Sequence, residues 1–142
     1  MRAGGGDFQG VEQIIELHVG PEVLTGSTRM KAGTATKMVL NMISTVSFVK
    51  LGKVWGNRMV DLHATNDKLR DRAVRIMLHH CPDLSGSRAA ALHLLDEADG
   101  RVKHALVMAH CDVDAATAQA LLDAKKGKLR EVLESPPESV DD

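Results

Sequence analysis

The most regular pattern of hydrophobic positions in the chain lies between residues 28 and 50. Apolar side chains recur there at intervals of three and four residues, which places them on one face of an α-helix. Ser27 or Thr28 can cap the start of this helix, and apart from Gly33 no glycine or proline interrupts the pattern before Gly52. We therefore expect a helix over about 28–50 with one wide face buried against another surface. That face consists of Ala35, Met38, Val39, Met42, Ile43, Val46 and Val49.

On either side of this helix the pattern predicts short strands. Residues 14–19 combine large apolar and β-branched side chains before a Gly-Pro pair, which indicates a strand that leads into a loop. After the helix, Gly56 and Asn57 predict a turn, and residues 59–62 fit a second short strand.

The remainder of the chain is predicted to be helical. A second helix runs from Thr65 or Asn66, either of which can cap it, to about His80, and Pro82 stops it. Beyond residue 85 the pattern changes to shorter helices that end at glycines or are capped by Asp114. We expect these helices over 87–98, 102–110 and 115–125, followed by a last turn over 129–133.

These elements predict four regions along the chain. Residues 1–13 form an irregular leader, because four glycines oppose regular structure there. Residues 14–82 form a first structured region, and residues 83–134 form a C-terminal domain of three helices. The acidic tail over 135–142, which begins with a serine and two prolines, is expected to be disordered.

Composition narrows the classes of function for these 142 residues. The only aromatic residues are Phe8, Phe48 and Trp55, which argues against a stacking surface for single-stranded nucleic acid. A net charge of −1 gives no general field for polyanions, so we expect no nucleic-acid partner. Polar residues break every long apolar stretch, which predicts no membrane span. Cys81 and Cys111 are interpreted as reduced thiols of a cytoplasmic protein.

The candidate for chemistry is the loop that leads into the long helix. Unpaired amides at a helix N-terminus favour an anion, and hydroxyls and a guanidinium add donors. This predicts an anion site formed by Ser27, Thr28, Arg29 and Lys31, and the plain alternative is a helix cap beside solvated basic residues. On a regular helix Arg29 and Lys31 are about 200° apart, so both can face one ligand only if the first turn is irregular.

Histidines and cysteines near the helix ends raise the alternative of a zinc site. These residues are His79, His80, Cys81, His110 and Cys111. Adjacent ligands on a helix point in different directions, and the chain has no Cys-x-x-Cys or His-x-x-x-His spacing. We therefore predict no metal site and interpret these residues as helix-end histidines and buried thiols.

The same loop carries a resemblance to a known family. The run from Gly20 to Lys37, with matching positions that continue to Arg75, resembles the C-terminal half of the N-acetylmuramic acid 6-phosphate etherases. Its Gly20–Gly33 portion resembles the signature that these enzymes share with the glucokinase regulatory protein. The match is looser over the last fifty residues, where it resembles the small ubiquitin-associated-like domain of three helices at the end of the family.

This resemblance implies a fold and a reaction. The fold is the C-terminal portion of an α/β sugar isomerase (SIS) type domain over 14–82, followed by the three-helix domain. The reaction cleaves the lactyl ether of N-acetylmuramic acid 6-phosphate to N-acetylglucosamine 6-phosphate and D-lactate in peptidoglycan recycling. The resemblance also implies homodimers, carboxylates as acid and base, and no metal or other cofactor.

The chain matches only part of the family sequence, and this affects the activity that we expect of it. Family members are longer, and the part that precedes the match carries most of the sheet, a phosphate loop and two catalytic glutamates. Glu12, Glu16 and Glu22 do not match those glutamates, so the chain is predicted to hold no catalytic residue and to be inactive alone. We interpret the chain as the C-terminal part of an etherase. The alternative functions are a non-catalytic sugar-phosphate-binding regulatory protein and a helical protein-interaction module.

Overall fold

The structure is a computed structural model that describes residues 10–84 and 86–134. These residues contain six α-helices, one short 3-10 helix and one two-stranded sheet, so the described chain is mostly helical, as predicted. Its contacts divide it into two units, Met1–Ser47 and Phe48–Asp142, which are described separately below. Residues 1–9 of the leader predicted over 1–13, and the acidic tail over 135–142, lie outside the described residues. Residues 10–13 have no helix or strand, as predicted for the leader.

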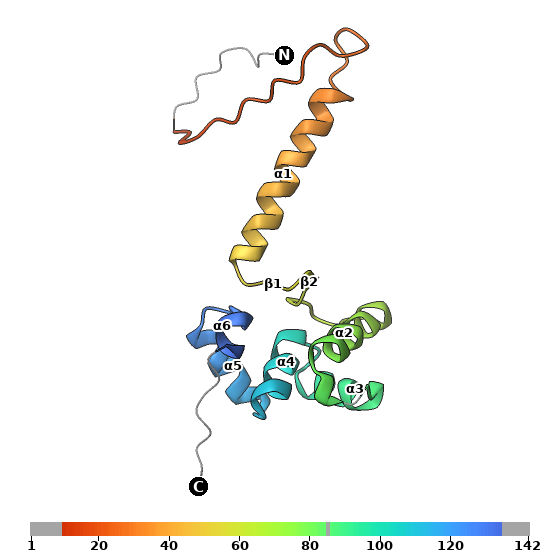
Figure 1. Cartoon of the computed structure of the whole chain (residues 1–142), viewed down its shortest axis with the longest axis vertical. Helices are drawn as coiled ribbons and strands as arrows, with labels where there is room; N and C mark the ends of the chain where they lie inside the picture. The colour runs from red at the N-terminus through yellow and green to blue at the C-terminus, as the bar shows by residue number, and fades with distance from the viewer. Residues whose placement is uncertain (1–9, 85, 135–142) are drawn as a thin grey trace. The chain divides into compact units, whose positions relative to one another are not determined.

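The first unit consists of an irregular loop and most of helix α1 (Lys31–Lys50), which Figure 1 shows as one continuous helix. The predicted strand over 14–19 is wrong, because that segment has no regular secondary structure. A strand is stabilised by pairing with a neighbour, and the only paired strands among the described residues are two short ones much later in the chain.

The helix predicted over 28–50 forms, but its apolar face is not buried. No residue of α1 is buried in the described chain. Met38, Met42, Ile43, Val46 and Val49 are between 51 and 58% exposed. The expectation of a buried face is therefore wrong for the chain as described, although the helical spacing on which it rested is present.

The second unit begins with a hairpin of strands β1 (Val54–Trp55) and β2 (Arg58–Met59). The strands are antiparallel, with Val54 opposite Met59 and Trp55 opposite Arg58. The predicted turn at Gly56 and Asn57 connects them, and the second strand lies slightly earlier than the predicted 59–62.

Helix α2 (Asp67–His80) begins at one of the two predicted caps, and α3 (Arg88–Glu97) begins after Ser87, the first residue of the helix predicted over 87–98. Asn66 Oδ1 accepts from the amide of Leu69 at 3.0 Å, and Ser87 Oγ accepts from the amide of Ala90 at 3.2 Å. A short 3-10 helix, η1 (Pro82–Leu84), follows α2 at the proline that was expected to stop it.

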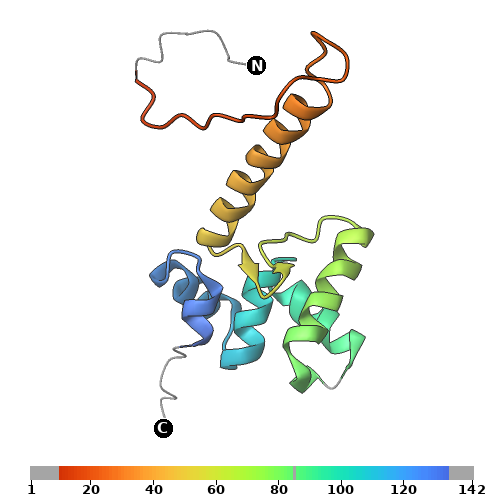
Figure 2. The same cartoon turned by 45° about the horizontal axis from the view of Figure 1, so that its top comes forward.

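Three further helices complete the second unit: α4 (Val102–Cys111), α5 (Ala115–Ala124) and α6 (Leu129–Leu133). Helix α4 is the central one, because it contacts α2, α3, α5 and α6 (Figure 2). Its buried side chains share one hydrophobic core with those of the surrounding helices and with Val60 and Ala64. Burial of this kind is the main stabilising contribution in a small helical unit.

The segment after the hairpin is attached to the connection between α3 and α4 by two backbone hydrogen bonds. The Ala64 amide donates to Gly100 O at 2.8 Å, and the Val102 amide donates to Leu62 O at 3.0 Å. Helix α2 thus belongs to the same packed unit as α3–α6. The contacts therefore divide the chain near residue 47, whereas the predicted division at 82–83 refers to the domains of a longer protein and stays a prediction.

Where the structure is described, no helix is both long enough and apolar enough to cross a membrane.

Candidate functional site

The loop before α1 is shaped by a carboxylate that the sequence analysis did not assign to it. Glu22 accepts hydrogen bonds from the amide of Lys31 at 3.1 Å and from the amide of Ala32 at 3.0 Å. A carboxylate at a helix N-terminus also interacts favourably with the helix dipole. The bonds from Ala32 and then Lys31 lower the pKa of Glu22 below 4.5, so its side chain is ionised at neutral pH.

The other two amides of the first turn of α1 are also satisfied. The Gly33 amide donates to Thr28 O at 2.8 Å, and the Thr34 amide donates to Met30 O at 3.2 Å. Ser27 and Thr28 were expected to cap this helix with their side chains, and that expectation is wrong because Glu22 occupies the position of the cap. The first four amides are therefore not free to bind an anion in this conformation.

Two of the predicted site residues lie together. Arg29 and Lys31 both line a hollow of about 570 Å³, with Val19 and Met38 among its apolar walls. This is possible because α1 begins at Lys31, so Arg29 precedes the regular helix. Arg29 therefore lies in the irregular segment before the helix, as a ligand shared with Lys31 would require.

The other two predicted residues lie elsewhere in the loop. Thr28 lines a separate hollow of about 220 Å³ together with Glu22 and Thr25. Ser27 lines neither of these hollows, and its amide donates to Leu24 O at 3.0 Å. The four predicted residues therefore do not form one closed site in the first unit.

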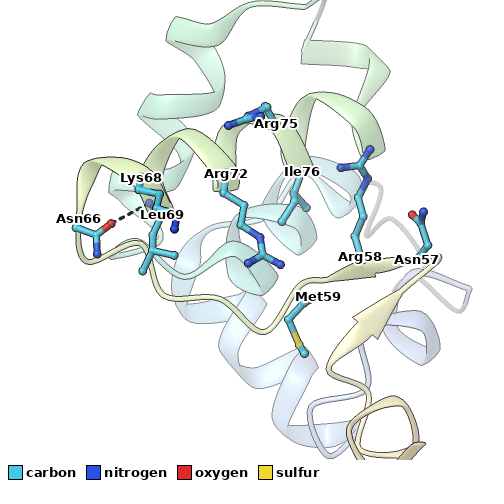
Figure 3. A pocket seen from close by; sticks show the side chains of 9 residues that line it. All are labelled: Asn57, Arg58, Met59, Asn66, Lys68, Leu69, Arg72, Arg75 and Ile76. Carbon is cyan, nitrogen blue, oxygen red and sulfur yellow. Dashed lines mark hydrogen bonds between the residues drawn. The ribbon is translucent and has the colours of Figure 1, made fainter. Parts of the chain in front are cut away.

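A second candidate site, which the sequence analysis did not identify, lies in the second unit. It is a hollow of about 630 Å³ between the β1–β2 hairpin and α2 (Figure 3). Its lining contains four basic side chains and no acidic one. The lining residues are Asn57, Arg58, Met59, Asn66, Lys68, Leu69, Arg72, Arg75 and Ile76.

The spacing of the basic residues on α2 was an available signal for this site. Lys68, Arg72 and Arg75 are separated by four and three positions, which places them on one side of the helix. Arg58 comes from the hairpin, ten residues earlier than Lys68, so only the tertiary structure brings it to the same hollow.

The histidines and cysteines that raised the zinc alternative form an aromatic cluster. The Trp55 ring is stacked on His80 with their centroids 4.0 Å apart, and His110 meets the edge of Trp55 at 5.3 Å. Cys81 Sγ lies 3.5 Å from His110 Nδ1, which also lies 2.9 Å from Leu106 O.

Neither thiol of the described chain belongs to a disulfide, and both have a raised pKa. Burial, together with the charge of Asp83, raises the pKa of Cys81 to about 11. Burial raises the pKa of Cys111 as well. Both are therefore protonated at neutral pH, which does not favour metal coordination. In the part of the chain that the structure describes, no three His, Cys, Asp or Glu side chains are grouped so that they could hold a metal ion.

Comparison with known proteins identifies relatives of most of the chain. It is 56% identical over 121 residues to an N-acetylmuramic acid 6-phosphate etherase of Prochlorococcus marinus strain MIT 9303, which covers 85% of this chain and 37% of that protein. It is 54% identical over 121 residues to the etherase of Picosynechococcus sp. strain PCC 7002, covering 85% and 39%. The etherase of Synechocystis sp. strain PCC 6803 is 53% identical over 123 residues, covering 87% and 39%.

No family model matches the chain. The chain spans less than two fifths of the length of these curated relatives, and the match covers their C-terminal portion. Identity above 50% over about 85% of the chain shows common ancestry and confirms the resemblance noted in the sequence. The chain is therefore homologous to the C-terminal portion of the N-acetylmuramic acid 6-phosphate etherases.

Proposed function

We propose that the chain is the C-terminal part of an etherase that cleaves the lactyl ether of N-acetylmuramic acid 6-phosphate. The products are N-acetylglucosamine 6-phosphate and D-lactate, and the role is peptidoglycan recycling in the cytoplasm. The observation that carries this proposal is the identity of 53–57% with etherases over about 85% of the chain. Relatives named as enzymes give no support to the alternatives of a regulatory sensor or an interaction module.

In this proposal the chain contributes to substrate binding and the rest of the longer protein contributes the chemistry. The catalytic glutamates lie in the portion that precedes the matched region, so this chain alone is inactive. No metal or other cofactor takes part. Residues 14–82 complete a sugar isomerase type domain, residues 83–134 form the three-helix domain, and two copies form a homodimer.

Within this chain, Ser27, Thr28, Arg29 and Lys31 are the proposed substrate-binding residues. Arg29 and Lys31 support the proposal best, because both line one hollow. The charge of Lys31 also interacts with the Glu22 carboxylate, so Arg29 is the stronger candidate of the two. Their two positive charges suit the phosphate of the substrate. The hydroxyls of Ser27 and Thr28 are further donors in the same loop.

A chimera tests this proposal. The matched C-terminal portion of the Prochlorococcus marinus MIT 9303 etherase is replaced by this chain, and D-lactate release from N-acetylmuramic acid 6-phosphate is followed with a coupled lactate assay. We expect the chimera to release D-lactate, whereas the truncated relative and this chain alone do not. A folded chimera without activity would contradict the proposal, and so would turnover by this chain alone.

A further inference from the structure

We propose that the hollow between the β1–β2 hairpin and α2 binds a phosphate monoester. This would be a second phosphate site, separate from the one proposed at Arg29 and Lys31. The choice of a sugar phosphate as its ligand rests on the proposed function, whereas the anion site itself rests on the geometry of the second unit. The lining residues that this chain contributes all belong to the second unit.

The lining of the hollow is positively charged. Arg58, Lys68, Arg72 and Arg75 line it, and no Asp or Glu is among the lining residues. Figure 3 shows the Arg72 side chain extending from α2 toward the hairpin and the Arg58 side chain extending from the hairpin toward α2. Like charges that line one hollow repel each other, and an anion bound there reduces that repulsion.

The four cations of the lining differ in whether an acidic side chain pairs with them. Arg75 is bound to Asp71, which also accepts from Arg88 at 2.9 Å, so Arg75 is already neutralised. Arg58, Lys68 and Arg72 have no ion pair within the described part of the chain. By contrast, Arg70 on the same helix lies 2.6 Å from Asp96. Lys68 and Arg72 of α2 therefore line the hollow without an acidic partner, whereas Arg70, which does not line it, has one.

An unsatisfied donor strengthens the assignment. Arg58 Nε is buried and has no hydrogen-bond partner among the described residues. Leaving a buried polar group without a partner costs free energy, so such groups are rare and call for a reason. A phosphate in the hollow would meet the terminal NH groups of this guanidinium, because the buried Nε itself is not accessible. Arginine suits phosphate because its donors match two oxygens at once.

The remaining lining residues indicate a small phosphorylated ligand with a polar body. Asn57 and Asn66 carry amide donors, and since Asn66 Oδ1 caps α2, its Nδ2 is left to donate. Met59 and Leu69 form an apolar part of the lining beside the cations. A nucleic-acid backbone would require an extended basic surface, which a chain with a net charge of −1 does not offer.

Calorimetry on the full chain tests this site. The probes are N-acetylglucosamine 6-phosphate, inorganic phosphate and N-acetylglucosamine without phosphate. We expect both phosphates to bind and the unphosphorylated sugar not to bind. Arg72→Gln should weaken binding roughly ten- to a hundredfold, because a charge-assisted hydrogen bond is lost. Arg58→Gln should have a similar effect. The matched control is Arg70→Gln, which removes the same charge from the same helix outside the hollow.

The outcomes separate this inference from the proposed function. Equal weakening in Arg70→Gln and Arg72→Gln would show a diffuse charge effect and overturn the site, as would the absence of phosphate binding by the wild-type chain. Loss of binding in Arg29→Gln alone would place the phosphate in the loop before α1, overturning this inference and supporting the proposed function. Phosphate binding in the hollow with an inactive chimera would support the site and contradict the proposed function. If Arg72→Gln does not fold, as judged by circular dichroism, Lys68→Gln replaces it.

Discussion

At the residue scale, Gly52 and Gly56 differ in what surrounds them although both have a left-handed backbone. Their φ angles are +69° and +58°. A Cβ at Gly52 would lie 2.7 Å from the Cα of Lys128, whereas a Cβ at Gly56 would meet nothing within 4 Å. The conformation penalises any side chain at either position, and only Gly52 adds a steric clash with backbone.

We predict that Gly56→Ala lowers the free energy of unfolding by about 1 kcal/mol. Gly52→Ala should lower it by about 3 kcal/mol, because the clash with Lys128 adds to the same backbone strain. Urea unfolding of the two variants measures this difference. Equal destabilisation would show that the close approach of Gly52 to Lys128 does not exist in solution.

The stacked pair of Trp55 and His80 predicts how stability depends on pH. Burial, and then the neighbouring charges of His79, Arg58 and His110, lower the pKa of His80 below its ordinary value of 6.5. The unfolded chain therefore binds a proton at this residue more readily than the folded chain. This contribution to stability is complete above pH 6.5 and is lost as the pH falls below it, toward the lowered pKa.

Unfolding in urea, followed by the fluorescence of the single tryptophan, tests this at pH 7.5 and 5.5. We expect a lower free energy of unfolding at pH 5.5 and a smaller difference between the two values in His80→Gln. His93→Gln is the control, because His93 is exposed and lies 3.4 Å from Glu97. An unchanged pH difference in His80→Gln would contradict the prediction.

At the element scale, local signals predicted the helices of the second unit well. Asn66, Ser87 and Asp114 each cap the helix that follows, and each bond joins residues only three positions apart. The cap of α1 could not be found in the same way, because Glu22 lies nine and ten positions before the amides that it accepts from. Its carboxylate reaches them through the fold of the loop.

Strand and burial predictions failed where they depended on a partner. The 14–19 segment has the composition of a strand, but a strand forms by pairing, which composition does not supply. The spacing along α1 defines its apolar face correctly without stating what covers it. The cationic hollow was missed for a related reason, since Arg58 joins Lys68 and Arg72 only through the packing of the hairpin near α2.

The exposed apolar face of α1 predicts self-association of this chain. Met38, Met42 and Val46 are all more than half exposed, and burial of such side chains is worth about 25 cal/mol per Å². We expect light scattering at high micromolar concentration to give a mass above that of the monomer. The double variant Met42→Lys with Val46→Lys should reduce that mass to the monomer.

The matched control adds the same two charges on the polar side of α1, as Asn41→Lys with Thr45→Lys. This variant should associate like the wild-type chain. A monomeric wild-type chain, or equal dissociation in both double variants, would show that the apolar face does not drive association.

At the scale of the whole molecule, the chain corresponds to 37–39% of the length of its relatives. In the proposed function this chain contacts the substrate and the preceding portion of the longer protein transfers protons. Kinetics of the chimera can separate the two roles, because lost ground-state binding raises KM, whereas lost transition-state stabilisation lowers kcat.

The most direct test of this division of roles is KM and kcat of the chimera with Arg29→Ala. We expect KM for N-acetylmuramic acid 6-phosphate to rise roughly ten- to a hundredfold, because a charge-assisted hydrogen bond to the phosphate is lost. The value of kcat should change little. Lys37→Ala, which removes a charge from α1 away from both hollows of the loop, should change neither constant. A fall in kcat at constant KM, or no change in either constant for Arg29→Ala, would contradict a substrate-binding role for this chain.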